Sequence, residues 1–89
     1  MPKTMSKLNG VIGARLRRRR KELGFSQTAI GDKLGIAFQQ IQKYENGMNR
    51  ISAASLYELS KVLSVPLGYF FEKDQAQATS KKRKAKRGT

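Results

Sequence analysis

Two short helical segments on either side of a glycine constrain the fold of this 89-residue chain more than any other feature. The first helix is predicted over residues 27–34, with Ser26 as its N-cap and Gly35 as its stop. The second is predicted over residues 37–45 and is stopped by Gly47. Because so few residues separate them, the two helices must pack directly against each other.

Three further helices are predicted around this pair, and no strand-like alternation of useful length occurs. Their ranges are 10–23 with Asn9 as N-cap, 53–63 with Ser52 as N-cap, and 66–71, which Pro66 opens. Apolar side chains at helical spacing supply the predicted core: Ile12, Leu16, Leu23, Ala29, Ile30, Leu34, Leu56, Leu59, Val62 and Leu63. The chain is therefore predicted to be all-α, with five short helices.

Composition divides the chain into three parts. Residues 1–8 lack periodicity and are predicted to be a flexible arm, and residues 9–73 form the predicted folded domain. Residues 74–89 contain no large apolar side chain and are predicted to be a disordered basic tail. The run 81–87 in this tail could track phosphates, act as a nuclear localisation signal, or be solvated without a specific role. Non-specific affinity for DNA is the favoured interpretation.

The charge balance points to a polyanionic partner. Lys and Arg number 19 against 6 Asp and Glu, a net charge of +13, and residues 1–73 alone carry 13 basic and 5 acidic side chains, a net charge of +8. Nucleic acid is the first candidate partner and an anionic membrane surface the second. No apolar run approaches the roughly 18–20 residues that span a bilayer, and the N-terminus does not resemble a secretory signal. A cytoplasmic protein is therefore expected.

Residue types argue against catalysis and metal binding. The chain has no His and no Cys, which excludes disulfides and thiolate metal sites. Its few acidic residues are scattered rather than paired, so an enzyme is not expected, nor any cofactor or metal.

The spacing of four residues is typical of a helix-turn-helix. Gln27 opens the first helix, Gly31 stands where the two helices must approach closely, Gly35 suits a positive φ in the turn, and Ile41 anchors the second helix. With the "YENG" that follows, this pattern resembles the phage repressor and Cro-like domains of the Xre family, over about residues 10–72. The resemblance implies a compact five-helix, lambda-repressor-like fold whose second motif helix enters the DNA major groove.

The second motif helix presents a polar face on the predicted wheel. Ala37, Ile41 and Tyr44 cluster toward the core. The opposite side carries the candidate base-contacting residues Phe38, Gln39, Gln40, Gln42 and Lys43. Glutamine can bond bidentately to adenine and lysine can reach guanine, but glutamine is also common on solvated surfaces. The resemblance favours Phe38, Gln39 and Lys43, with the other two secondary; Phe38 could contact a thymine methyl or fold inward.

Phosphate contacts are expected at both ends of the motif. By resemblance, Gln27 clamps the DNA backbone, and free N–H groups at the start of its helix favour an anion, with help from Ser26. Asn46 is the matching candidate at the other end. Arg50 and Arg17 complete the set of predicted phosphate-contacting residues.

A buried ion pair is expected between the first helix and the motif. Periodicity brings both Arg19 and Arg20 to the edges of the apolar stripe, and a buried guanidinium needs a partner. Glu45 is the only acid in the third helix. Periodicity does not choose between the two arginines, whereas the resemblance selects Arg20.

The resemblance also implies a homodimer on a two-fold symmetric double-stranded operator. Its predicted contact residues are Val65, Leu67, Tyr69, Phe70 and Phe71, although these aromatics could instead close the core of the monomer. A transcriptional regulator, most simply a repressor, is the expected function. The alternative is an antitoxin-type DNA-binding protein that also covers a toxin partner. An RNA-binding basic protein would fit the charge but would not explain the motif spacing.

Overall fold

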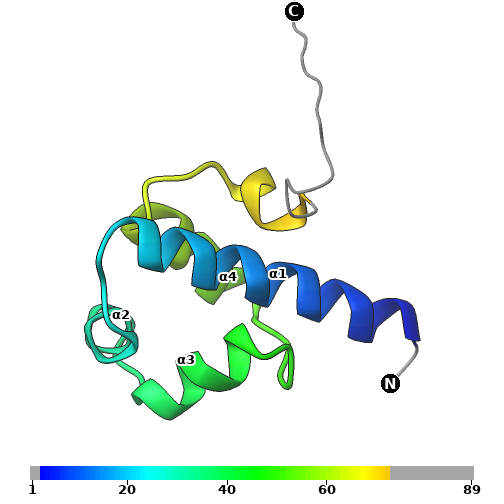
Figure 1. Ribbon diagram of the computed structural model, residues 1–89, viewed down its shortest axis with the longest axis horizontal. Helices are drawn as coiled ribbons and strands as arrows, with labels where there is room; N and C mark the ends of the chain where they lie inside the picture. The colour runs from blue at the N-terminus through cyan, green and yellow to red at the C-terminus, as the bar shows by residue number, and fades with distance from the viewer. Residues whose placement is uncertain (1–2, 73–89) are drawn as a thin grey trace, which may run out of the picture.

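The computed structural model describes residues 3–72, with side chains from Lys7 onward. The elements in chain order are α1 (Lys3–Glu22), α2 (Gln27–Leu34), α3 (Phe38–Glu45), α4 (Ala53–Val62) and η1 (Leu67–Phe71) (Figure 1). Within residues 3–72 there is no strand, so the predicted all-α class is confirmed there. The fifth element is a 3-10 helix, because it is only five residues long and its Tyr69 N–H bonds to Pro66 O. The predicted tail lies outside the described residues.

Helix α1 begins earlier than predicted. It starts at Lys3 instead of near Gly10, so residues 3–8 are helical and not a flexible arm. Asn9 is consequently buried inside the helix and is not its N-cap. Lysine, methionine and leucine make up most of residues 3–8 and favour a helix, although too few of these residues are apolar to produce a periodic signal.

The core takes a fully buried side chain from every element. These side chains are Leu16, Ile30, Ile41, Leu59, Leu63 and Phe70. Leu34 and Val62, which were predicted inward, pack against the edge of this core. The prediction that Leu23 belongs to the core is wrong, because this residue lies beyond the end of α1 and is 39% exposed. Phe25 packs against the core from the same connection.

Helix α1 runs across the molecule between η1 and α3 (Figure 1). On the α3 side the contact is backbone to backbone, because a Cβ at Gly13 would lie 2.2 Å from Tyr44 O and 2.7 Å from Glu45 O. A glycine is therefore required at this position of α1. The close contact fixes the C-terminal end of α3 on α1.

On the opposite side, two arginines one turn apart hold the ends of other elements. Arg19 Nε donates to Leu63 O at 2.9 Å, at the C-terminus of α4, and Arg15 Nε donates to Tyr69 O at 3.2 Å in η1. Arg15 is buried, with its guanidinium 4.0 Å from the centre of the Tyr69 ring. Burial raises the pKa of the Tyr69 phenol, and the adjacent Arg15 charge offsets part of that rise.

The predicted dimer-contact residues do not share one surface. Phe70 is fully buried and closes the core of the monomer, so it is not available to a second chain. Val65 and Tyr69 are partly buried against the core. Leu67 and Phe71 remain 45% and 47% exposed, respectively. The sequence could not separate these residues, because a 3-10 helix turns its adjacent aromatic side chains in different directions.

Candidate nucleic-acid interface

The turn between α2 and α3 has the geometry that its residues predicted. Ser26 Oγ accepts a hydrogen bond from Ala29 N at 2.9 Å and caps α2. Gly35 has a φ of 75°, in the left-handed region. A Cβ at Gly31 would lie 2.6 Å from Ile36 O, so this glycine lets the turn approach α2 closely. The two helices pack against each other across this turn as a helix-turn-helix, with α2 seen end-on and α3 lengthwise in Figure 1.

One face of α3 is buried in the domain. Ile41 is fully buried, Glu45 is 7% exposed, and Tyr44 packs against the core. Ala37 does not belong to this face, contrary to the prediction, because it is the exposed N-cap residue with an extended backbone. The buried face therefore begins at Ile41.

The opposite face of α3 is open to solvent. Gln39, Gln42 and Lys43 are exposed, and Gln40 at the edge is half-buried. Phe38, for which two orientations were considered, is 43% exposed and does not belong to the core cluster. The outward face of α3 thus carries amides, one cation and an aromatic ring, without a carboxylate.

Three elements meet at the carboxylate of Glu45. Arg20 Nε donates to Glu45 Oε2 at 2.5 Å and Arg20 Nη2 donates to Glu45 Oε1 at 3.1 Å, with both residues buried. Arg20 Nη1 also donates to Phe25 O at 2.8 Å. The ion pair that the resemblance selected is therefore present, while Arg19 bonds to Leu63 O instead. The pair joins α1 to the last residue of α3.

Gln27 connects this buried pair to the surface. Its Nε2 donates to Glu45 Oε1 at 3.1 Å, which is the oxygen that also accepts from Arg20 Nη2. The side chain is half-buried at the first residue of α2. A primary amide has two N–H groups, so one donor of Gln27 remains beyond the bond to Glu45.

The other predicted phosphate-contacting residues lie on the surface. Ser26 is exposed beside Gln27, and Asn46 is exposed as the C-cap of α3. Arg50 is exposed in the loop from α3 to α4, and Arg17 is exposed on α1. The Ser26 hydroxyl accepts the capping bond and can still donate its own proton.

Residues 3–72 meet neither the requirements of a metal site nor those of a membrane-spanning helix. Residues 3–72 contain no cluster of acidic residues that could hold a metal ion. None of their helices combines the length and apolarity needed to cross a membrane.

Comparison with known proteins agrees with the geometry. The sequence model of a helix-turn-helix family, HTH_3, matches residues 16–70, which include the whole motif. The chain belongs to this helix-turn-helix family. The family comprises Xre- and Cro-like DNA-binding regulators and not enzymes.

Two similar proteins are named as transcriptional regulators. A protein of Sinorhizobium medicae, named an uncharacterized HTH-type transcriptional regulator, is 54% identical over 61 residues, covering 68% of this chain and 44% of the relative. A Rhodospirillum rubrum protein, named an uncharacterized transcriptional regulator in the ATPase CF(0) region, is 46% identical over 69 residues, covering 78% and 64%, respectively. The matched segments thus span about half the length of these relatives.

A solved structure shares the fold. The restriction-modification controller protein C.AhdI from Aeromonas hydrophila superposes with a TM-score of 0.67 at 24% identity, covering 71% of this chain and 96% of that one. At this level of identity the likeness concerns the fold alone. The two proteins therefore share the arrangement of the four α-helices and η1.

Proposed function

We propose that this protein is a transcriptional repressor that reads the major groove of double-stranded DNA with α3. The observation that carries the proposal is the division of α3 into two faces. Ile41 and Glu45 are buried, so the domain holds the helix rigidly, while Gln39 and Lys43 project outward without an acidic neighbour on that face. A polar, cation-bearing helix face of this kind is compatible with a groove lined by phosphates.

Within this proposal the exposed side chains have different tasks. Gln39 contacts adenine and Lys43 contacts guanine, Phe38 packs on a thymine methyl group, and Gln40 and Gln42 assist. Phosphates are bound by the set Ser26, Gln27, Asn46, Arg50 and Arg17. Gln27 uses one amide N–H for its bond to Glu45. Its second N–H is therefore available to donate to a phosphate oxygen.

The same proposal includes a homodimer and a two-fold symmetric operator, since one small module covers little DNA and two copies supply the specificity. Regulation of transcription also implies a cytoplasmic location.

A selection from random duplexes tests the reading helix. The wild-type protein, Gln39→Ala and Lys43→Ala are each used to enrich binding sequences, with Lys61→Ala on the exposed surface of α4 as a matched loss of one cation. The two α3 variants should each lose preference at specific base positions, whereas Lys61→Ala should enrich the wild-type sequence. Identical selected sequences from all four proteins would refute α3 as the reading helix.

The selected sequence then allows a test of repression. A reporter promoter that overlaps the selected site should lose transcription when the protein is supplied, because a bound dimer excludes polymerase. A scrambled site is the control. Increased transcription from the intact site would instead identify an activator.

A further inference from the structure

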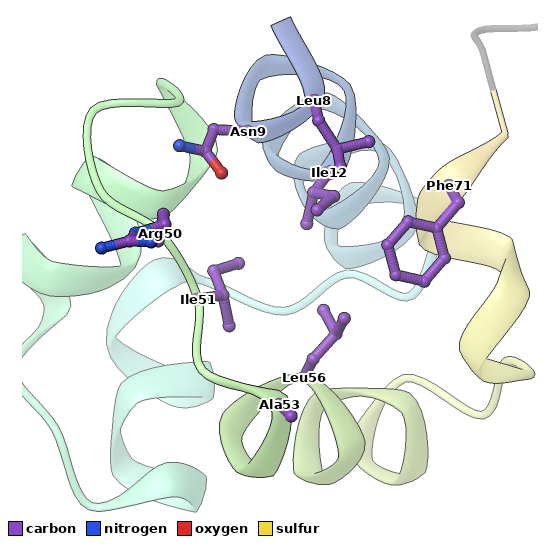
Figure 2. Close-up of a pocket in the computed structure, with 8 residues that line it drawn as sticks. All are labelled: Leu8, Asn9, Ile12, Arg50, Ile51, Ala53, Leu56 and Phe71. Atoms are coloured by element: carbon purple, nitrogen blue, oxygen red, sulfur yellow. The ribbon is translucent and has the colours of Figure 1, made fainter. Parts of the chain in front are cut away.

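An apolar hollow of about 280 Å³ lies between α1, the loop from α3 to α4, the start of α4, and η1. Figure 2 shows its aliphatic side chains in the middle, with Phe71 on one side and the polar residues Asn9 and Arg50 on the other. The aliphatic side chains are Leu8, Ile12, Ile51 and Leu56, and Ala53 completes the lining. The hollow is therefore apolar along most of its length and polar at one edge.

The hollow is open to solvent. Leu8 is 42% exposed and Phe71 is 47% exposed, although both are large apolar side chains. Sites for small molecules are typically concave and mostly apolar, with a few polar groups that orient the ligand. This combination of shape and lining is typical of a small-molecule site.

The polar edge carries one charge, and this charge is positive. None of the eight lining residues is acidic. Arg50 is exposed and forms no ion pair with any residue between 3 and 72. A guanidinium binds a carboxylate through two parallel hydrogen bonds. The lining is therefore complementary to a molecule with an apolar body and one anionic end.

We propose that the hollow binds a free aliphatic carboxylate of about eight to ten carbon atoms, with its chain between Ile12, Ile51 and Leu56 and its carboxylate on Arg50. A cavity of about 150 Å³ can hold a benzene ring, so about 280 Å³ corresponds to a chain of this length. A lipid with two long chains exceeds this volume. Residues 73–89 contain no large apolar side chain, so the C-terminal segment of this chain is not suited to fill the hollow.

The bound carboxylate should weaken the binding of DNA. Arg50 belongs to the residues that the proposed function assigns to DNA phosphates, and a carboxylate on its guanidinium neutralises the charge that attracts a phosphate. The ligand thus acts as an effector that lowers the affinity for DNA. This effector role rests on the proposed function, whereas the binding site itself does not.

An NMR titration of the full chain with sodium octanoate, without DNA, tests the site. Octanoate should bind saturably with a dissociation constant of about 1 mM or below. Its amide shifts should cluster at residues 8–12, 50–56 and 71. Acetate is the matched ligand control, because it has the same charge without the apolar chain, and it should produce no saturable shift in these residues.

Two pairs of variants locate the ligand. Ala53→Leu fills part of the hollow and should weaken octanoate binding at least about tenfold, whereas Ala54→Leu, at an exposed neighbouring position outside the lining, should not. Arg50→Gln should weaken binding at least about threefold, and Arg17→Gln, at an exposed arginine of α1, should leave it unchanged. Circular dichroism melts show whether each variant remains folded.

Fluorescence anisotropy with the selected duplex tests the effector role. Saturating octanoate should raise the dissociation constant for DNA about two- to fivefold in the wild type and leave it unchanged in Ala53→Leu. Unchanged DNA affinity of the wild type would overturn the effector role.

The site itself has separate contrary outcomes. No saturable binding of octanoate below about 10 mM, equal shifts with acetate, or unchanged binding in Ala53→Leu would each overturn it. An apparent affinity that falls as the protein concentration rises would assign the hollow to a second copy of the chain and would also overturn it. Failure to select any DNA sequence would count against the proposed function and the effector role, while the titration without DNA still decides the site.

Discussion

The two faces of the eight-residue helix α3 differ in their burial. The inner face holds Ile41, fully buried, and Glu45, which bonds to α1 and α2. On the outer face, the side chains of Gln39 and Lys43 are exposed and form no hydrogen bond or ion pair with any of the residues that the structure describes. Inner side chains therefore determine where the helix lies, and outer side chains are free to determine what it binds. Stability and recognition should then respond to different substitutions on the same helix.

The largest effect is expected at the ion pair. Glu45→Ala leaves Arg20 buried without its carboxylate and removes the acceptor of Gln27, so the free energy of unfolding should fall by about 3–5 kcal/mol. Chemical denaturation measures this loss. Glu58→Ala, at an exposed site of α4, is the control and should change stability by no more than about 0.5 kcal/mol. Equal stability of the two variants would contradict an inner role for Glu45.

The second-largest effect on stability is expected in α1, the helix against which the inner face of α3 packs. Gly13→Ala places a Cβ against the carbonyls of Tyr44 and Glu45 and should destabilise the protein by about 1–3 kcal/mol. Gly10→Ala meets no atom within 4 Å and should instead stabilise the helix by up to about 1 kcal/mol. Thermal melts of the pair compare the same substitution in one helix. If both substitutions changed the melting temperature in the same direction, α3 would not be held against Gly13.

On the outer face, Gln39→Ala and Lys43→Ala should alter recognition without altering stability. Each should lower the discrimination between the selected site and a site with one changed base pair by about 1–3 kcal/mol. The free energy of unfolding should stay within about 0.5 kcal/mol of the wild type. Fluorescence anisotropy with both duplexes and a denaturation curve supply the two measurements. A drop in stability without a change in discrimination would assign these residues to the inner face.

The smallest effect is expected from Phe38→Ser on stability. Because Phe38 is 43% exposed and outside the core cluster, the melting temperature should change little, by an amount corresponding to about 0.5 kcal/mol. Ile41→Ala, three residues later, should cost about 2–5 kcal/mol. Comparable losses in both variants would mean that Phe38 packs inward in solution.

Local signals in the sequence predicted most of this fold. Ser26 and Ser52 cap the helices they precede, and Gly35 and Gly47 take the left-handed conformation after α2 and α3. Each of these features depends on a few neighbouring residues, so the sequence contains the information. The start of α1 was missed because residues 3–8 have helix propensity but no apolar repeat.

Contacts between distant residues were predictable only in part. The family resemblance, and not periodicity, selected Arg20 as the partner of Glu45. The bond from Gln27 to Glu45 spans 18 residues and was not predicted, because it depends on how the start of α2 packs beside the end of α3 and not on a local pattern. The different exposures of Phe70 and Phe71 depend on how η1 lies on α1, which no local pattern specifies.

Backbone contact between α1 and α3 has a consequence for motion. Besides the contact of Gly13 with the last two residues of α3, a Cβ at Gly47 would lie 3.0 Å from Cα of Gly10, so two glycines of α1 approach the end of α3 and the turn that follows it with no side chain of their own between the backbones. A junction without intervening side chains has no rotamers that could absorb a small tilt. Helices α1 and α3 should therefore move as one rigid body, and their amide protons should exchange with solvent in a single cooperative opening.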